Sequence, residues 1–186
     1  MSDSDGWCTP PEITEPLEQF FCGHVDVDPC SNERSIVKSR VAYSSGGLIR
    51  PWRLPNPANW SVYQNDPYSQ SGVWTDKMLY ELASGNVHEL VRLCMMSTST
   101  QWWEAMCNTR YLDVPGQTRD CREIRNPKIL GIKRVAFLDW DPERIAKRGS
   151  KLVGCRFEPA LVYFGQNPQE FSRAFSHLTR WSTWGR

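Results

Sequence analysis

The sequence lacks any long apolar run. No stretch of its 186 residues approaches the length that a helix needs to cross a membrane. Residues 1–12 are acidic and polar, without the basic and apolar regions of a signal peptide. We therefore expect a soluble intracellular protein with no membrane partner.

The sequence also lacks the patterns of a metal site or a disulfide framework. Its seven cysteines include no Cys-x-x-Cys pair and no cluster with histidine at zinc spacing. Their odd number and wide spacing favour reduced, mostly buried thiols over disulfides. The three histidines are scattered, and we assign none of them a catalytic role and the chain no metal.

An excess of charge of either sign is absent too. Lys and Arg number 22 against 21 for Asp and Glu, so the net charge of +1 gives no overall attraction to nucleic acid. A nucleic-acid surface would have to be a local patch, and residues 110–134 hold seven cations and three acids. This segment is either a phosphate-binding and target-recognition surface or a solvated loop. The candidate DNA-binding residues are Arg110, Arg119, Arg122, Arg125 and Lys128.

Patterns typical of helices and strands alternate along the chain. With 40% hydrophobic residues we expect one domain over residues 1–186, with a basic insertion at about 108–133. Expected strands are 24–28, 60–63, 90–96, 134–138 and 160–164, and expected helices are 9–21, 32–40, 74–83, 101–107 and 169–178. In the first helix, Thr9 stands at the position of a hydroxyl N-cap. The alternation predicts an α/β fold with a mainly parallel sheet, which binds ligands at the carboxyl ends of its strands.

Two loops follow expected strands in the first half of the chain. Asp28-Pro29-Cys30 comes after the strand at 24–28, and Asn65-Asp66-Pro67-Tyr68 after the strand at 60–63. Asn, Asp and Pro are ordinary turn residues, so each loop could be a simple turn. Their position at strand ends favours a functional site.

The order of several short motifs resembles the phage-type, Dam-like DNA N6-adenine methyltransferases. The resemblance extends from about residue 7 to residue 165. It rests on Trp7-Cys8-Thr9-Pro10, Val27-Asp28-Pro29-Cys30-Ser31-Asn32, Gly46-Gly47-Leu48 with Pro51-Trp52, Asn65-Asp66-Pro67-Tyr68-Ser69, and on the later stretches 97–102, 133–137 and 159–165.

This resemblance implies an S-adenosylmethionine-dependent methyltransferase (Rossmann-like) fold with helices on both faces of the sheet. It implies S-adenosylmethionine as cofactor, bound by Thr9, Pro10, Asp28, Pro29 and Cys30. It also implies a site-specific enzyme that methylates adenine in duplex DNA, in a bacterial or phage-infected cell, for example in restriction-modification.

The catalytic residues implied by the resemblance are Asn65, Asp66, Pro67 and Tyr68. The adenine amine is a poor nucleophile, and two acceptors, the Asn65 side-chain oxygen and a backbone carbonyl of the loop, would offset the positive charge that develops on it. Tyr68 would stack on the adenine after the base has left the duplex.

The loop departs from the family pattern at one position. Asp66 stands where relatives carry the first of two adjacent prolines. The backbone carbonyl is retained, but the loop has one ring fewer and an added carboxylate, which could act as an extra acceptor or repel phosphate. Activity could be retained, altered in target or lost.

Two other functions remain open from the sequence. The same fold could methylate a protein glutamine or a small molecule, because the loop can present any planar amide or amine to the cofactor. The chain could also be a catalytically degenerate relative that binds DNA or cofactor without turnover.

Overall fold

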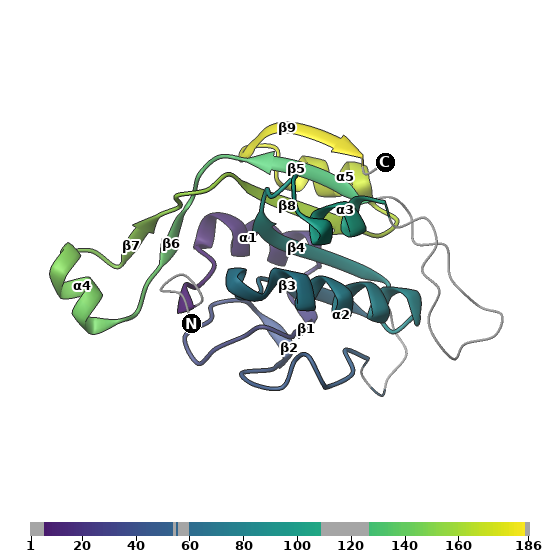
Figure 1. Ribbon diagram of the computed structural model, residues 1–186, viewed down its shortest axis with the longest axis horizontal. Coiled ribbons are helices and arrows are strands. Elements are labelled where there is room, and N and C mark those ends of the chain that lie inside the picture. Colours follow the sequence, from purple (N-terminus) through teal and green to yellow (C-terminus); the bar gives the residue numbers. More distant parts are fainter. Residues whose placement is uncertain (1–5, 54, 56–59, 109–126, 185–186) are drawn as a thin grey trace.

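The central sheet has seven strands in the order β2-β1-β3-β4-β8-β5-β9 (Figure 1). The computed structural model describes residues 6–53, 55, 60–108 and 127–184. The strands of this sheet are β1 (Val25–Asp28), β2 (Ser39–Ala42), β3 (Ser61–Gln64), β4 (Glu89–Met95), β5 (Lys128–Ile132), β8 (Pro159–Phe164) and β9 (Thr179–Trp184).

The sheet is parallel in one half and antiparallel in the other. Strands β2, β1, β3 and β4 run parallel to one another. Strand β8 pairs antiparallel with both β4 and β5, and β9 pairs antiparallel with β5. The expected α/β class is confirmed, and the expected mainly parallel sheet is a mixed sheet whose parallel half contains both candidate loops.

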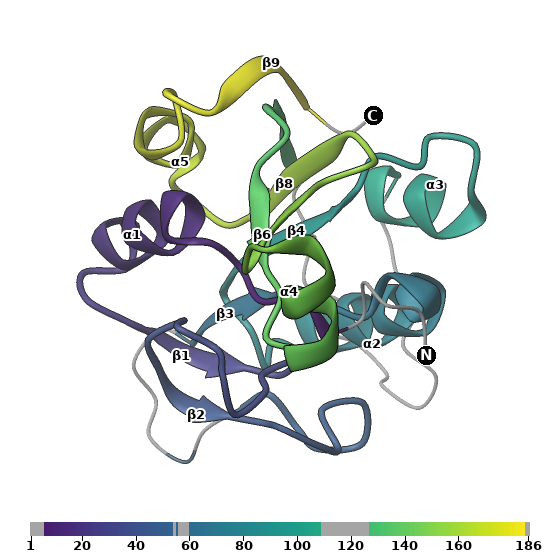
Figure 2. The same cartoon turned by 90° about the vertical axis from the view of Figure 1, so that its left-hand side faces the viewer.

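Helices cover both faces of the sheet, as expected (Figure 2). On one face α1 (Pro11–Phe20) lies beside α5 (Pro168–Ala174), and on the other α2 (Ser71–Ala83) lies beside α3 (Gln101–Cys107). Each pair has its own buried cluster: Ile13 and Phe171 belong to the first, and Met78 and Trp103 to the second. Strands β1, β3 and β8 are buried along their whole length because both of their faces are covered.

Helix α1 begins differently from the sequence prediction. Its N-cap is Pro10, whose carbonyl accepts from the backbone N–H groups of Ile13 and Thr14. The predicted side-chain cap at Thr9 is therefore wrong: the Thr9 hydroxyl lies against β3 instead, where it contacts Tyr63.

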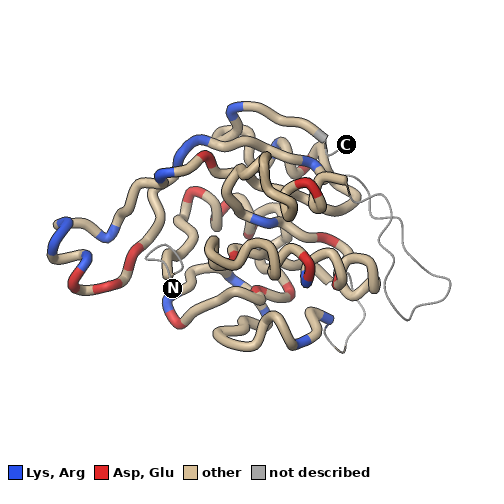
Figure 3. Tube along the Cα trace, viewed as in Figure 1, with Lys and Arg blue, Asp and Glu red and all other residues tan. Residues whose placement is uncertain are grey.

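A small arm projects from the body of the molecule (Figures 1 and 2). It consists of β6 (Ala136–Leu138), α4 (Pro142–Arg148) and β7 (Leu152–Gly154), with β6 and β7 paired antiparallel. Acidic and basic residues stand side by side along the arm (Figure 3). Asp139 accounts for part of this pattern, because its buried carboxylate accepts from both Arg144 and Arg148.

Three further expectations are corrected. Residues 32–40 form no helix, because the backbone from Ser39 pairs in parallel register with β1. The expected basic insertion at 108–133 ends earlier, because residues 128–132 form β5 between β8 and β9. The strand expected at 134–138 is the shorter β6, which belongs to the arm and not to the main sheet. Residues 109–126 lie outside the described residues.

None of the helices in the described part of the chain is long and apolar enough to span a membrane.

Candidate active site

The two candidate loops lie side by side at one edge of the sheet. Strands β1 and β3 are parallel neighbours, with Val27 opposite Val62, so the residues after Asp28 and after Gln64 emerge at the same edge. The Asn65 backbone lies close enough to the Cys30 thiol to offset part of the rise that burial causes in the pKa of that thiol, so the two loops are neighbours. The sequence prediction that both loops follow strands is confirmed.

Asn65 is held through the nitrogen of its side chain. Its Nδ2 donates to Thr9 Oγ1 at 3.1 Å, and that oxygen lies 2.9 Å from the Tyr63 hydroxyl. Thr9 and Tyr63 are both buried, which fixes this contact in place. This contact uses the Nδ2 donor of the Asn65 amide. The Oδ1 atom at the other end is the acceptor to which an amine substrate would donate.

Asp66 is buried and paired with an arginine on the neighbouring strand β4. Arg92 Nε donates to Asp66 Oδ1 at 2.8 Å and Arg92 Nη2 to Asp66 Oδ2 at 2.9 Å, so the contact is bidentate. Gln64 Nε2 donates to Asp66 Oδ1 at 2.9 Å as well. Both charged side chains are 0% exposed. The Asp66 carboxylate therefore points into the protein.

Arg92 makes further contacts with the beginning of α2. Its Nη1 donates to Thr75 Oγ1 at 2.6 Å and its Nη2 to the Ser71 carbonyl at 3.2 Å. Its guanidinium carbon also lies 5.0 Å from the centre of the Trp102 ring. Burial alone lowers the pKa of Arg92, but the Asp66 charge offsets this and the net direction is upward, so the side chain stays charged.

Pro67 and Tyr68 begin the short 3-10 helix η2 (Tyr68–Gln70), which leads into α2. The Pro67 carbonyl accepts from the Gln70 N–H at 2.8 Å. The Tyr68 ring is 9% exposed and packs edge-on against Phe137 and Phe157, at centroid distances of 6.4 and 4.7 Å. The expected base-stacking residue thus belongs to the aromatic core in this structure.

Asp28 ends β1 in a buried position. Its Oδ1 accepts from the Cys30 N–H at 3.1 Å, and burial raises the pKa of the carboxyl to about 6. A buried carboxylate with this pKa gains from any cation that approaches it. Burial also raises the pKa of the Cys30 thiol, and the nearby charges of Asp66 and Asp28 act in the same direction.

Pro29 is covered by the glycine-rich loop that follows β2. A Cβ on Gly47 would lie 2.0 Å from the Pro29 carbonyl oxygen, so only glycine allows this approach. The Gly47 carbonyl in turn accepts from the buried Trp52 Nε1 at 2.8 Å. Loop 28–30 is therefore packed between the glycine-rich loop and the Asn65 loop.

The structure places one of the predicted DNA-binding residues. Lys128 is the first residue of β5, and its Nζ lies 3.5 Å from Ser182 Oγ on β9. Arg110, Arg119, Arg122 and Arg125 lie outside the described residues.

Sequence reasoning missed Arg92 and Gln64. A signal was present for Arg92, because it interrupts the apolar stretch Leu90-Val91-Arg92-Leu93-Cys94 of a predicted buried strand. A charge at such a position requires a buried partner. Asp66, the departure from the family pattern, is that partner.

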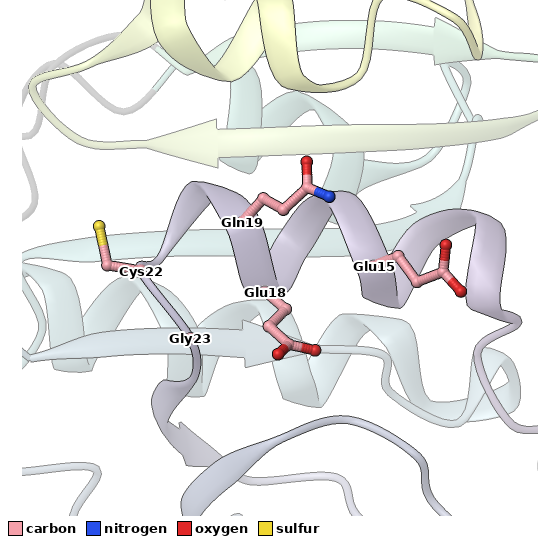
Figure 4. Close-up of a pocket in the computed structure, with 5 residues that line it drawn as sticks. All are labelled: Glu15, Glu18, Gln19, Cys22 and Gly23. Carbon is pink, nitrogen blue, oxygen red and sulfur yellow. The ribbon is translucent and has the colours of Figure 1, made fainter.

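Two other features contribute nothing to this site. No group of three or more His, Cys, Asp or Glu side chains suited to a metal ion occurs within the described ranges. A hollow of about 440 Å³ lies beside the end of α1 and the turn after it (Figure 4), and its lining includes no residue of either loop. Its lining residues are Glu15, Glu18, Gln19, Cys22 and Gly23.

Comparison with known proteins identifies the family. No curated protein matched the sequence. The sequence model of one family, described as DNA N-6-adenine-methyltransferase (Dam), matches residues 1–114, which include both loops and Arg92. Since this match covers more than half of the chain, the protein belongs to the DNA N-6-adenine-methyltransferase (Dam) family.

Proposed function

We propose that the protein transfers a methyl group from S-adenosylmethionine to the N6 amine of adenine in DNA, at specific sites. The observation that carries this proposal is the Asn65 loop: an amide held by Thr9 at the carboxyl end of β3, beside the buried Asp28, in a chain of the Dam family. In this proposal the sheet with its two helical layers corresponds to the Rossmann-like fold of S-adenosylmethionine-dependent methyltransferases.

The residues at the end of β1 suit this cofactor. Asp28 is a buried carboxylate whose raised pKa reflects burial, and the ammonium of the methionine part would offset that cost. Pro29 and Cys30 give the loop a shape fixed by Gly47 on one side and by Asn65 on the other. When bound, the cofactor would supply a methyl group on a sulfonium, whose sulfur leaves as a neutral thioether while the methylated nitrogen releases one proton to the solvent.

Thr9 and Pro10 lie at the start of the described chain, next to the same loops. Because Thr9 contacts Asn65, the segment assigned to the cofactor also orients the catalytic amide. Pro10 is buried and begins α1, which keeps Thr9 in position.

The protein's own contribution to the reaction is placement and electrostatics. Asn65 Oδ1 accepts one hydrogen of the adenine amine, and the Asp66 backbone carbonyl accepts the other. These acceptors offset the positive charge that grows on the nitrogen as it is methylated. Correct placement of the reacting groups contributes on the order of 7–11 kcal/mol to the lowering of such a barrier.

The target adenine has to leave the duplex to reach Asn65. In this proposal Tyr68 forms an aromatic wall for the base, held edge-on by Phe137 and Phe157. The basic segment with Arg110, Arg119, Arg122, Arg125 and Lys128 contacts DNA phosphates and selects the target sequence.

The test is methyl transfer from labelled S-adenosylmethionine to mixed-sequence duplex DNA. Wild-type protein should label adenine N6, and Asn65→Ala should reduce the rate by at least about 100-fold while the protein still binds the cofactor. Asn86→Ala is a matched control, because Asn86 is also half-buried and also donates one side-chain hydrogen bond, to Glu81 at 2.8 Å.

The same assay separates the two other functions. Labelling of a glutamine-containing peptide in preference to DNA would show that the substrate is a protein and not DNA. Cofactor binding without transfer to any of these substrates would identify a degenerate relative.

A further inference from the structure

We propose that Asp66 and Arg92 act as a positioning pair, which fixes the Asn65 loop for catalysis in place of the rigid proline expected at position 66. The role in catalysis rests on the proposed function, whereas the role in ordering the loop does not.

The pair is suited to fixing a loop. Its two hydrogen bonds, at 2.8 and 2.9 Å, are parallel contacts between a planar guanidinium and a planar carboxylate, which restrict both distance and orientation. Both side chains are fully buried, so neither water nor salt weakens the contact. The position of the Asp66 side chain is therefore determined by β4.

The network extends to both ends of the loop. At the start, Gln64 pairs with Arg92 across β3 and β4 in backbone register and also donates to Asp66. At the end, Arg92 donates to the Ser71 carbonyl and to Thr75 in the first turns of α2. Asn65 lies between Gln64 and Asp66, so both of its chain neighbours are held by the same group of side chains.

The geometry excludes two direct roles for the Asp66 carboxylate. Both oxygens accept from Arg92, and the side chain is 0% exposed, so it is not placed to take a proton from the substrate. For the same reason it does not face DNA phosphates. Asp66 acts through the loop, and its backbone carbonyl remains the group that faces the reaction.

Energetics explains why the two residues have to occur together. Arg92 stands in a strand whose neighbouring residues Val91 and Leu93 are both 0% exposed. Without Asp66, its charge would be buried and uncompensated, which is far more destabilising than replacing both partners by apolar residues. A chain with Asp66 needs Arg92, and a chain with proline at 66 has no need of it.

The first variant to test is Asp66→Asn, which keeps the shape of the side chain and removes its charge. Its matched control is Glu81→Gln, an equally conservative change at a buried carboxylate of α2 that is paired with Lys77 at 2.5 Å. Both variants lose a buried ion pair, and only one of these pairs contacts the Asn65 loop. Thermal unfolding records the loss of stability in each variant.

For Asp66→Asn we expect kcat to fall by about 10- to 100-fold with unchanged KM for S-adenosylmethionine, because a misplacement of about 1 Å costs about that much. We also expect faster hydrogen–deuterium exchange over residues 64–71. Glu81→Gln should keep the wild-type kcat and the wild-type exchange over this segment. The double variant Asp66→Pro/Arg92→Leu should fold and recover most of the activity, because it removes both buried charges and introduces a rigid proline ring at position 66.

Unchanged kcat and unchanged exchange in Asp66→Asn would overturn the inference, as would equal effects of Asp66→Asn and Glu81→Gln on kcat. If wild-type protein transfers no methyl group to DNA, the proposed function fails, and the exchange over residues 64–71 still decides the ordering role. If Asp66→Asn does not fold, the folded double variant decides: kcat near wild type supports the inference, and kcat as low as in Asn65→Ala overturns it.

Discussion

Asn65 and Thr9 are 56 residues apart in the chain and are joined by a hydrogen bond of 3.1 Å from Nδ2 to Oγ1. This bond orients the amide, because it decides which end of the side chain faces the protein. It also joins the segment before α1 to the loop after β3. The candidate cofactor site and the candidate catalytic loop are therefore connected through Thr9.

Replacement of Thr9 tests this contact. Thr9→Val keeps the shape of the side chain and removes the acceptor for Asn65 Nδ2, so the amide loses its fixed orientation. We expect kcat to fall by about 10-fold, which corresponds to a hydrogen bond of about 1.4 kcal/mol. Steady-state kinetics measures the change, and Thr9→Ser, which keeps the hydroxyl, should remain close to wild type. Equal activity of the valine and serine variants would show that the bond has no role.

The raised pKa of Asp28 makes the stability of the free protein depend on pH. Burial raises this pKa from 3.8 to about 6, so the folded state holds the proton more strongly than the unfolded state. Asp28 therefore contributes about 3 kcal/mol to the free energy of unfolding. This contribution is fully present below about pH 4 and is lost as the pH rises to about 6. Urea unfolding of wild type and Asp28→Asn from pH 4 to 7 measures it as a difference. Parallel pH profiles of the two proteins would contradict this assignment.

The same group makes cofactor binding depend on pH. The cationic cofactor favours ionised Asp28, so affinity for S-adenosylmethionine should fall by up to about tenfold per pH unit below pH 6. Calorimetric titration at several pH values measures this, and binding near pH 6 should release protons. Asp28→Asn should bind weakly at every pH; binding as tight as wild type would remove Asp28 from the cofactor site.

The hydroxyl and the ring of Tyr68 have different expected roles. Among the described residues the buried hydroxyl has no hydrogen-bond partner, so Tyr68→Phe should leave both stability and kcat close to wild type. The ring packs on Phe137 and Phe157, and Tyr68→Ala should therefore cost about 3–5 kcal/mol of stability. Urea unfolding and methyl transfer assays measure both. A large loss of activity in Tyr68→Phe would give the hydroxyl a role in the reaction.

The parts of the fold with clear local patterns were predicted from the sequence. Helix α3 agrees with the prediction at both ends, and α2 agrees at its C-terminal end, where Gly85 adopts a positive φ of 69°. Strand β1 ends at Asp28 as expected, and β3 ends at Gln64, one residue after the expected end; Pro29 and Pro67 follow the two strands closely. These elements are the ones that carry the candidate loops.

In the antiparallel half of the sheet, strand β8 was predicted at 160–164, but its partner β5 and the edge strand β9 were not predictable from local patterns. Strand β5 contains Gly131, and a glycine makes a strand harder to predict from the sequence. The structure shows that a residue of β9 requires glycine at this position. A Cβ on Gly131 would lie 2.1 Å from the Trp181 ring, so the tryptophan covers the glycine across the two strands. Such a pairing joins residues 50 positions apart, and the sequence alone does not indicate it.

The position of the two candidate loops at strand ends was predicted from the sequence, but the contacts of their side chains were not. Asn65 and Asp28 lie at neighbouring strand ends as expected, because parallel strands bring their carboxyl ends together. The partner of Asp66 was missed, because Arg92 is 26 positions away and becomes its neighbour only through the pairing of β3 with β4. The packing of Tyr68 was missed as well, because it depends on Phe137 in β6. The sequence had predicted this segment as a strand of the main sheet.

The most direct test of the proposed function is the N6-methyladenine content of DNA from cells that express the protein, measured by mass spectrometry of nucleosides and mapped by sequencing. The cells should lack other adenine methyltransferases, and the comparison is between wild type and Asn65→Ala at equal expression. We predict N6-methyladenine at a defined sequence with the wild-type protein and none above background with the variant. Equal N6-methyladenine with both proteins, or none with the wild type, would contradict the assignment of Asn65 as the catalytic residue of a DNA adenine methyltransferase.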